Sequence, residues 1–236
     1  MTATALSVAK YRNMLAQINE RAASEVQNYL VNHNFEVDEA FIDFCHGLTT
    51  EFGEAVGALA CQMYDEMAEY WKATTNSKRW IKPAEPAAVP TRSDVENSVY
   101  GTMKTSTKQI PGAVQRLVKR TAEDTTLKNA IRDGAEFAWI PSGGSCAFCF
   151  ALASRGWQKA SDAAMSGGHA EHIHPNCNCT YTIRFDSKTE IQGYDPAAMK
   201  KVWKDLPGKK STDKMRSLRQ VLANDEKIGK YETTVD

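Results

Sequence analysis

Apolar residues recur every three or four positions from Ala5 to about His33, which predicts an amphipathic helix of unusual length. The same spacing returns from about Asp38 to Ala73 and predicts a second long helix. Gly47, Gly53 and Gly57 interrupt this second stretch. Each glycine weakens a helix by roughly 1 kcal/mol relative to alanine, so we expect these positions to let another helix approach closely.

The middle of the chain carries several signals for helix boundaries. Three prolines between Lys82 and Pro90 exclude a helix there and predict a linker or a surface arm. The segment Ser93–Glu96 is typical of a capping box and predicts the start of a third helix. A fourth helix is expected from Pro111 to about Arg132, because Gly134 is the residue type that most often ends a helix.

Shorter elements are expected in the last third of the chain. A short strand is predicted at Trp139–Pro141 and a helix at Cys146–Ser154. The alternating, β-branched segment Thr180–Phe185 predicts a second strand. Beyond it the chain is polar and rich in lysine, and Pro196–Asp205 and Thr212–Asn224 predict two short amphipathic helices.

Composition adds little, but local charge is informative. The chain has 236 residues, 42% of them hydrophobic and 25% charged, with a formal net charge of zero, as in an ordinary globular protein. Eleven acidic residues and one basic residue lie between Met14 and Tyr70, whereas basic residues dominate from Met103 to Arg132. Either the two regions attract each other or have solvated faces, or one of them is a docking surface for a charged partner.

No stretch of 18 apolar residues occurs, and no charged region followed by an apolar one stands at the N-terminus. We therefore expect a soluble protein made in the cytoplasm, without a membrane partner. Cys45 and Cys61 lie 16 residues apart in one predicted helix, too far to bridge, and are expected to be free buried thiols.

Four of the six cysteines form a metal-binding pattern. Cys146 and Cys149 make a C-x-x-C pair, and His174 is followed by Cys177 and Cys179. Thiolate sulfur and neutral imidazole are the preferred ligands of Zn²⁺, and four of them close a structural site. Either Cys177 or Cys179 could be the fourth ligand, with Cys177 slightly favoured because it is nearer to His174. The alternative is a set of reduced thiols without metal.

Catalytic readings of this region are weaker. His169 and Glu171 make an H-x-E pair as in zinc deaminases, but the C-x-x-C here precedes the pair rather than following it. These residues are expected in a polar loop, with His172 as a substitute ligand. No cysteine–histidine nucleophile pair independent of the metal pattern is visible. We therefore expect no catalytic residues and no enzyme activity. A zinc-knuckle-like nucleic-acid-binding module would need a denser basic surface.

The predicted elements combine into a mainly α protein. Long N-terminal helices form a helical domain at 1–134, with a linker at about 82–92. A small zinc-stapled α+β module occupies 135–186, and 187–236 form an extended, lysine-rich C-terminal arm with short helices. The arm has little apolar surface, so we expect both ends of the chain to order fully only against other proteins.

The run from Trp139 through Cys146, Cys149 and Arg155-Gly156, followed by the segment His174–Cys179 before a strand, resembles the C-terminal signature of phage minor head proteins of the Mu F type. It is similar in particular to the branch found in tailed phages of actinobacteria. The resemblance covers roughly 52–185 and is specific at the metal motif. The spacer between the two metal half-sites is shorter here than is usual in that family.

This resemblance implies a minor structural protein of the phage head that carries structural Zn²⁺. It implies a place inside the head or at the portal vertex of the virion, and a role in head morphogenesis or genome delivery. The implied partners are the portal protein and the major capsid protein, with packaged DNA as a further candidate and several copies per particle. The alternative function is a zinc-dependent nucleic-acid-modifying enzyme, such as a deaminase or a nuclease-like phage toxin.

Overall fold

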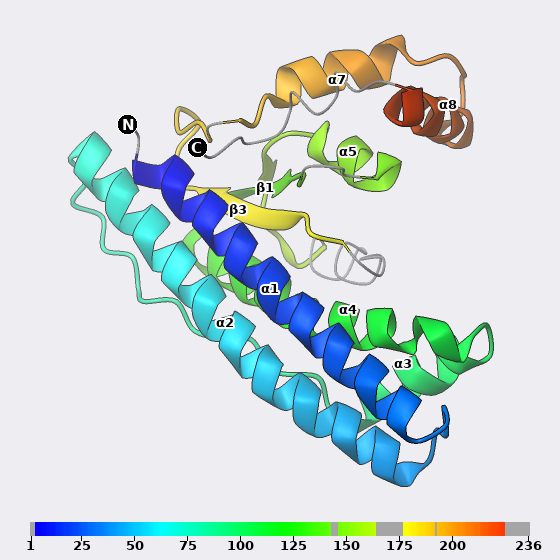
Figure 1. Ribbon diagram of the computed structural model, residues 1–236. Helices are drawn as coiled ribbons and strands as arrows, with labels where there is room; N and C mark the ends of the chain where they lie inside the picture. The colour runs from blue at the N-terminus through cyan, green and yellow to red at the C-terminus, as the bar shows by residue number, and fades with distance from the viewer. Residues whose placement is uncertain (1–2, 143–145, 164–176, 192, 225–236) are drawn as a thin grey trace.

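The computed structural model describes residues 3–142, 146–163, 177–191 and 193–224, and this part of the chain is mainly helical with one small sheet (Figure 1). The elements in chain order are α1 (Ala3–Asn32), α2 (Glu39–Thr75), α3 (Arg92–Met103), the 3₁₀ turn η1 (Thr107–Gln109), α4 (Ile110–Asp133), β1 (Glu136–Ile140), α5 (Ala147–Ala153), β2 (Gln158–Lys159), β3 (Thr180–Arg184), α7 (Pro196–Asp205) and α8 (Ser211–Asn224). The predicted class, mainly α with a small α+β module near the C-terminus, is confirmed.

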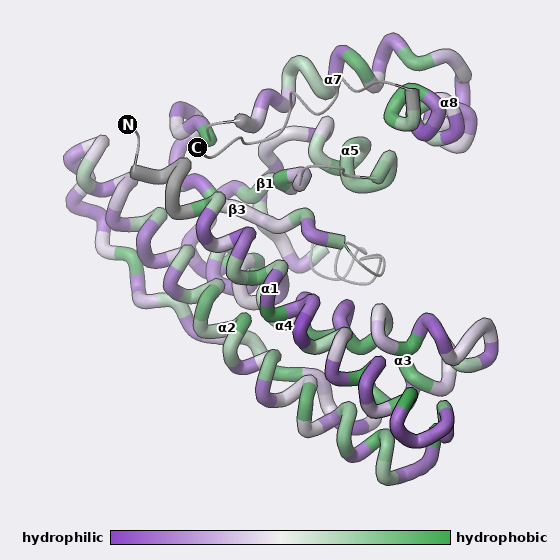
Figure 2. The backbone as a smooth tube through the Cα atoms, in the orientation of Figure 1, coloured by the Kyte–Doolittle hydropathy of each residue, from purple (hydrophilic) through white to green (hydrophobic). Residues whose placement is uncertain are grey.

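The two long N-terminal helices form an antiparallel hairpin. Asp38 begins α2, because its side chain accepts a hydrogen bond from the backbone of Phe41 at 2.9 Å. Asn34 and Phe35 in the connecting turn have positive φ angles of 53° and 61°. Hydrophobic and polar residues alternate around both helices in Figure 2, as the periodicity predicts. Both helices therefore have one apolar side to bury.

Helix α4 takes up those apolar sides and lies at the centre of the molecule. It contacts α1, α2 and α3, and it also contacts β1 and β3 of the sheet. Most of its side chains are buried, and Gly134 ends it in the left-handed conformation with φ 63°, as predicted. Several buried residues of α4 are nevertheless polar, among them Lys119, Glu123 and Asn129. Buried polar groups need partners. Helix α4 finds them in the proline-containing arm between α2 and α3 and in the α+β module that carries the cysteines, here called the cysteine module.

The proline-containing segment between α2 and α3 is a surface arm held by side-chain hydrogen bonds. The backbone N–H of Ala84 donates to Asp65 on α2 at 2.9 Å. Asn129 on α4 accepts from the backbone N–H of Glu85 at 3.0 Å and donates to its carbonyl at 2.9 Å. The amide of Asn129 thus binds the arm as a neighbouring strand would.

Two glycines of α2 admit this arm. A Cβ atom on Gly53 would lie 3.0 Å from Val89, and one on Gly57 would lie 3.4 Å from Pro86. Both positions also face α4, although the tightest contact of each is made by the arm. Gly47 has nothing within 4 Å. The expectation of close helix–helix approach therefore holds in part, because Thr121 of α4 lies 3.4 Å from a Cβ atom on Gly53 and 3.7 Å from one on Gly57, and the arm adds a second close approach.

The capping box of α3 lies two residues earlier than predicted. Thr91 caps the helix and accepts from the backbone of Asp94, whose carboxylate accepts from the backbone of Thr91 at 2.9 Å. Ser93 lies inside the first turn, and Glu96 pairs with Arg92 at 3.3 Å instead of capping. The predicted box at Ser93–Glu96 was wrong. Thr91 and Asp94 have the same spacing as Ser93 and Glu96, so the sequence pattern alone does not distinguish the two candidates.

The three-stranded sheet has the order β2-β1-β3 and is antiparallel throughout. Glu136 on β1 stands opposite Arg184 on β3, and the two side chains form an ion pair at 2.6 Å. Helices α2 and α4 contact β3, and α5 contacts β1 from the other side (Figure 1). The sheet is thus a middle layer, and β2 is too short for a sequence pattern to reveal.

Helices α7 and α8 pack against α5 rather than extending from the molecule. Met199, Leu206 and Leu218 are buried, and the hydroxyl of Tyr194 donates to the carbonyl of Ala153 at 2.8 Å. The lysine-rich segment therefore finds apolar partners in its own chain, because a few well-spaced apolar residues meet the exposed side of α5. None of the described helices combines the length and the apolar character that a membrane span requires.

Candidate metal centre

Three cysteine sulfurs meet between α5 and the start of β3. The Sγ atoms of Cys149, Cys177 and Cys179 all lie within 4.8 Å of one another, and all three residues are buried. The Sγ atoms of Cys149 and Cys177 are 3.4 Å apart. These separations bracket the roughly 3.8 Å expected between sulfurs that share a tetrahedral zinc at 2.3 Å. All six cysteines are free thiols, so no disulfide explains the cluster.

Cys146 lies beside this cluster at the beginning of α5. It is the N-cap of the helix, and its sulfur accepts a hydrogen bond from the backbone N–H of Cys149 at 3.5 Å. An N-cap residue and the third residue of the first turn lie on the same end of a helix, so the C-x-x-C spacing brings both sulfurs to that end. Cys146 is half-buried, unlike the other three.

The crowding of thiols has an electrostatic consequence. Hydrogen bonding to Cys146, Cys177 and Cys179, together with burial, raises the pKa of the Cys149 thiol. A divalent cation among the sulfurs would reverse this effect, because it favours the thiolate form of every ligand. The cluster therefore suits a metal better than it suits a free reactive thiolate.

The structure brings both Cys177 and Cys179, the two candidates for the fourth ligand, to the cluster. The two residues are separated by one position in an extended segment, so both side chains point to the same face. Both join Cys149 in the cluster, and Cys146, whose sulfur is outside that close group, lies beside it as the nearest further sulfur donor. The predicted ligand His174 lies outside the described residues, as do His169, Glu171 and His172.

Lys119 of α4 points into the same region and is 1% exposed. Its Nζ donates to the carbonyl of Cys177 at 2.9 Å, contacts the sulfur of Cys177 at 3.4 Å and also donates to the carbonyl of Cys179. The ammonium lies 5.3 Å from the centre of the Trp139 ring. A cation is thus held directly against the cysteine segment.

Glu123, one turn further along α4, binds the strand that follows the cysteines. One carboxylate oxygen accepts from the backbone N–H of Tyr181 at 3.1 Å, and the other lies 4.0 Å from Lys119. Burial raises the pKa of Glu123 to about 8, against the opposing effect of Lys119. Lys119 and Glu123 together connect the central helix to the cysteine module.

Ser142 completes the surroundings of Cys179. Its backbone N–H donates to the sulfur at 3.4 Å, and its hydroxyl lies 3.7 Å from the same atom. Hydrogen bonds from backbone N–H groups stabilise a metal-bound thiolate. Lys119, Glu123 and Ser142 were not predicted from the sequence to be residues of the site. The one available signal was the i, i+4 spacing of Lys119 and Glu123 on the side of α4 that also carries apolar residues.

Comparison with known proteins identifies the family. A family model described as VG15 protein matches residues 2–206. The chain belongs to the VG15 protein family. The match extends over the helical bundle, the cysteine module and α7, and the family indicates a phage-encoded protein. Nothing matches among the curated proteins or among the solved structures.

Proposed function

We propose that this VG15 protein is a minor structural protein of a tailed-phage head, of the Mu F type, with a zinc ion that holds its C-terminal module together. The observation that carries the proposal is the cluster of Cys149, Cys177 and Cys179, because these residues belong to the segment that resembles the Mu F signature. Cys146 supplies the fourth sulfur in this proposal, with His174 as the alternative.

The composition of the centre supports a structural rather than a catalytic metal. Four protein ligands leave a zinc ion without an open position, whereas catalytic zinc keeps one position for water or substrate. The cluster is also deeply buried between α5, β3 and α4. When bound, the metal supplies cross-links between segments, and the residues around it keep water out. We therefore propose that the protein has no enzyme activity.

The charged surfaces support docking onto other head proteins. Glu20 on α1 and Glu51 and Glu54 on α2 are exposed, and no ion pair to them is found in the described part of the chain. Arg21 lies 5.8 Å from the ring of Phe52, which brings these stretches of the two helices together. Glu20, Glu51 and Glu54 together give the N-terminal hairpin an acidic face, called the acidic face below. We propose that this face binds the portal or the major capsid protein.

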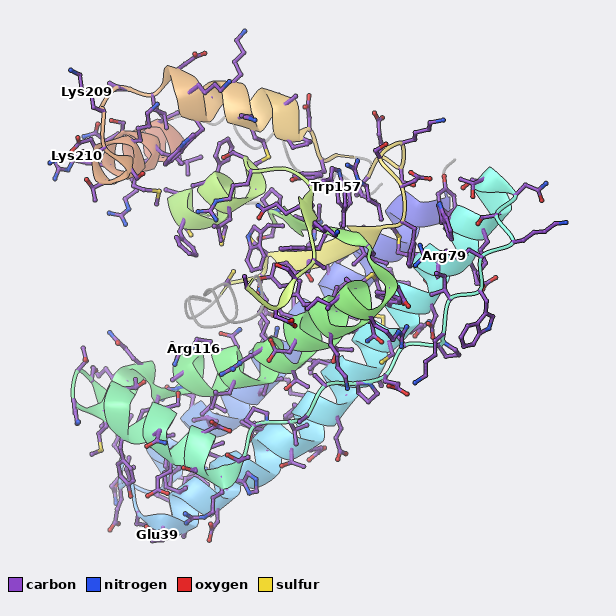
Figure 3. The ribbon with its side chains drawn as sticks, turned by 180° about the vertical axis from the view of Figure 1, so that it is seen from behind. Glu39, Arg79, Arg116, Trp157, Lys209 and Lys210 are labelled. Carbon is purple, nitrogen blue, oxygen red and sulfur yellow. The ribbon has the colours of Figure 1, made fainter. Side chains whose placement is uncertain are left out.

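A basic surface lies elsewhere on the molecule. Lys200 and Lys201 on α7 and Lys209 and Lys210 in the following loop are all exposed. Figure 3 shows Lys209 and Lys210 at the opposite end of the molecule from Glu39, where α2 begins. An acidic face on the α1–α2 hairpin and a basic surface on α7 and the loop that follows it suit a protein that bridges neighbours of different charge. Packaged DNA is a candidate for the basic one.

The location of the protein in purified particles tests the proposal. Mass spectrometry of separated heads and tails should find it in heads, including DNA-free heads, at far fewer copies than the major capsid protein. Particles from a portal-deletion phage should lack it if the acidic face binds the portal, and should retain it if that face binds the major capsid protein. Its absence from all particles, together with turnover of cytidine, adenosine or single-stranded DNA that is lost in Glu171→Gln, would instead establish the zinc-dependent enzyme.

A further inference from the structure

We infer that Lys119 is the counter-charge of an all-cysteine metal centre, and that this charge connects the central helix α4 to the cysteine module. The inference rests on the metal centre proposed above and adds a residue that lies more than 25 positions before the first cysteine of the motif. It concerns the charge of the centre, and hence its ligand set and affinity for metal.

The geometry of Lys119 fits an ammonium group. A lysine ammonium has three N–H donors and accepts nothing. Three acceptors lie around Nζ, namely the carbonyls of Cys177 and Cys179 and the sulfur of Cys177. The carboxylate of Glu123 is farther away, at 4.0 Å, and one of its oxygens already accepts from Tyr181. All three donors are therefore directed at the cysteine segment.

The charge of the metal centre explains why an ammonium group is buried beside it. Four thiolates around a divalent cation carry a net charge of −2, and three thiolates with a neutral histidine carry −1. Either charge is costly in a buried site unless a cation offsets it, and a buried ammonium is equally costly alone. Lys119 is almost fully buried and makes direct contact with a sulfur of the cluster. The positive charge of the lysine and the negative charge of the thiolates therefore offset the cost of burying each other.

The four-sulfur set needs this cation most. Cys149, Cys177 and Cys179 form the cluster, and Cys146, at the N-cap of α5 beside it, is the described residue that would supply a fourth sulfur. The set leaves one more negative charge to offset than a set with three cysteines and a histidine. Outer-sphere partners of metal ligands typically change metal affinity by about 10- to 100-fold. Loss of the Lys119 charge should therefore weaken the centre without removing any ligand.

The test compares Lys119→Met, Lys119→Arg and Lys128→Met in the full-length chain. Lys128 is an exposed lysine on the same helix, so its variant is matched in type but lies away from the cluster. Zinc affinity is measured by competition with a chelator, and melting temperature is measured with zinc and after metal removal. We expect about 10- to 100-fold weaker zinc binding in Lys119→Met. We expect little change in Lys128→Met and intermediate binding in Lys119→Arg, which keeps the charge.

The melting temperatures separate a charge effect from a packing effect. If Lys119 acts through the metal centre, Lys119→Met lowers the melting temperature of the zinc-loaded protein more than that of the metal-free protein. Equal losses in both states, with unchanged zinc affinity, would overturn the inference and leave Lys119 as a hydrogen-bond donor to two carbonyls. Failure of the wild-type protein to bind zinc would refute the proposed metal centre itself, which is a different result.

A measurement on the wild-type chain covers the case in which Lys119→Met does not fold. Acylation of lysine amines is followed by mass spectrometry before and after chelation. Lys119 should be protected in the zinc-loaded protein and become reactive once the metal is removed, while Lys128 reacts equally in both states. Equal protection of Lys119 in both states would show that its burial is independent of the metal, and the inference would fail.

Discussion

At the scale of single residues, the polar side chains buried on α4 decide how the bundle and the cysteine module meet. Lys119 donates to the carbonyls of the cysteine segment, and Glu123 accepts from the strand that follows it. Asn129 does the same for the arm between α2 and α3. Each of these contacts joins segments that are far apart in the sequence. A buried polar group of this kind is costly if its partner is removed.

Glu123 gives a testable pH dependence. Its pKa is raised to about 8 in the folded protein, mainly by burial, so the folded state holds a proton that the unfolded state releases near pH 4.5. Stability is therefore lost as the pH rises from about 4.5 to about 8, by at most about 1.4 kcal/mol per pH unit from this group. The charged and titratable groups that face it are Lys119, Asp124, Cys177, Tyr11 and Tyr181.

Glu123→Gln should remove this component, because glutamine stays neutral and can still accept from Tyr181. The variant should gain stability relative to the wild type as the pH rises from 5 to 8, with little difference below pH 4.5. Thermal melts of both proteins, with the same zinc loading at every pH, provide the measurement. A difference in melting temperature that is constant across this range would contradict the assignment of a protonated Glu123.

At the scale of elements, the start of α3 provides a comparison between two hydroxyl residues that lie two positions apart. Thr91 makes the capping box with Asp94, whereas Ser93 lies in the first turn. Thr91→Ala should cost about 1 kcal/mol of unfolding free energy, the usual value for a lost N-cap. Ser93→Ala should change it by no more than about 0.5 kcal/mol. Chemical denaturation of the two variants measures both values, and a larger loss in Ser93→Ala would reverse the assignment.

The helices were predictable because their signals are local. The apolar stripes of α1 and α2, the cap at Asp38 and the left-handed Gly134 all act over a few residues. The arm was harder to place, because its position depends on Asp65 and Asn129, which lie on two other elements. The capping box failed for a related reason, since two candidates with equal spacing differ only in where the chain turns.

At the scale of the whole molecule, the sheet is a layer between the helical bundle and the α5–α7–α8 group (Figure 1). The cysteine cluster joins α5 to the segment that leads into β3. The sequence predicted the cysteines as a group, because C-x-x-C and C-x-C spacings are local signals. It could not predict Lys119, which reaches the cluster through the packing of α4 against β3. A metal at this point would bind two parts of the molecule into one unit.

The metal content of the purified full-length protein tests most directly whether a metal centre joins the helical bundle to the cysteine module. Elemental analysis should find one zinc ion per chain, and Cys149→Ser should lose it together with much of the stability of the module, because metal binding and folding are coupled in such sites. Lys128→Met, on the exposed side of α4, should keep the full amount. Less than about half an equivalent of any metal in the wild-type protein would contradict the existence of the centre.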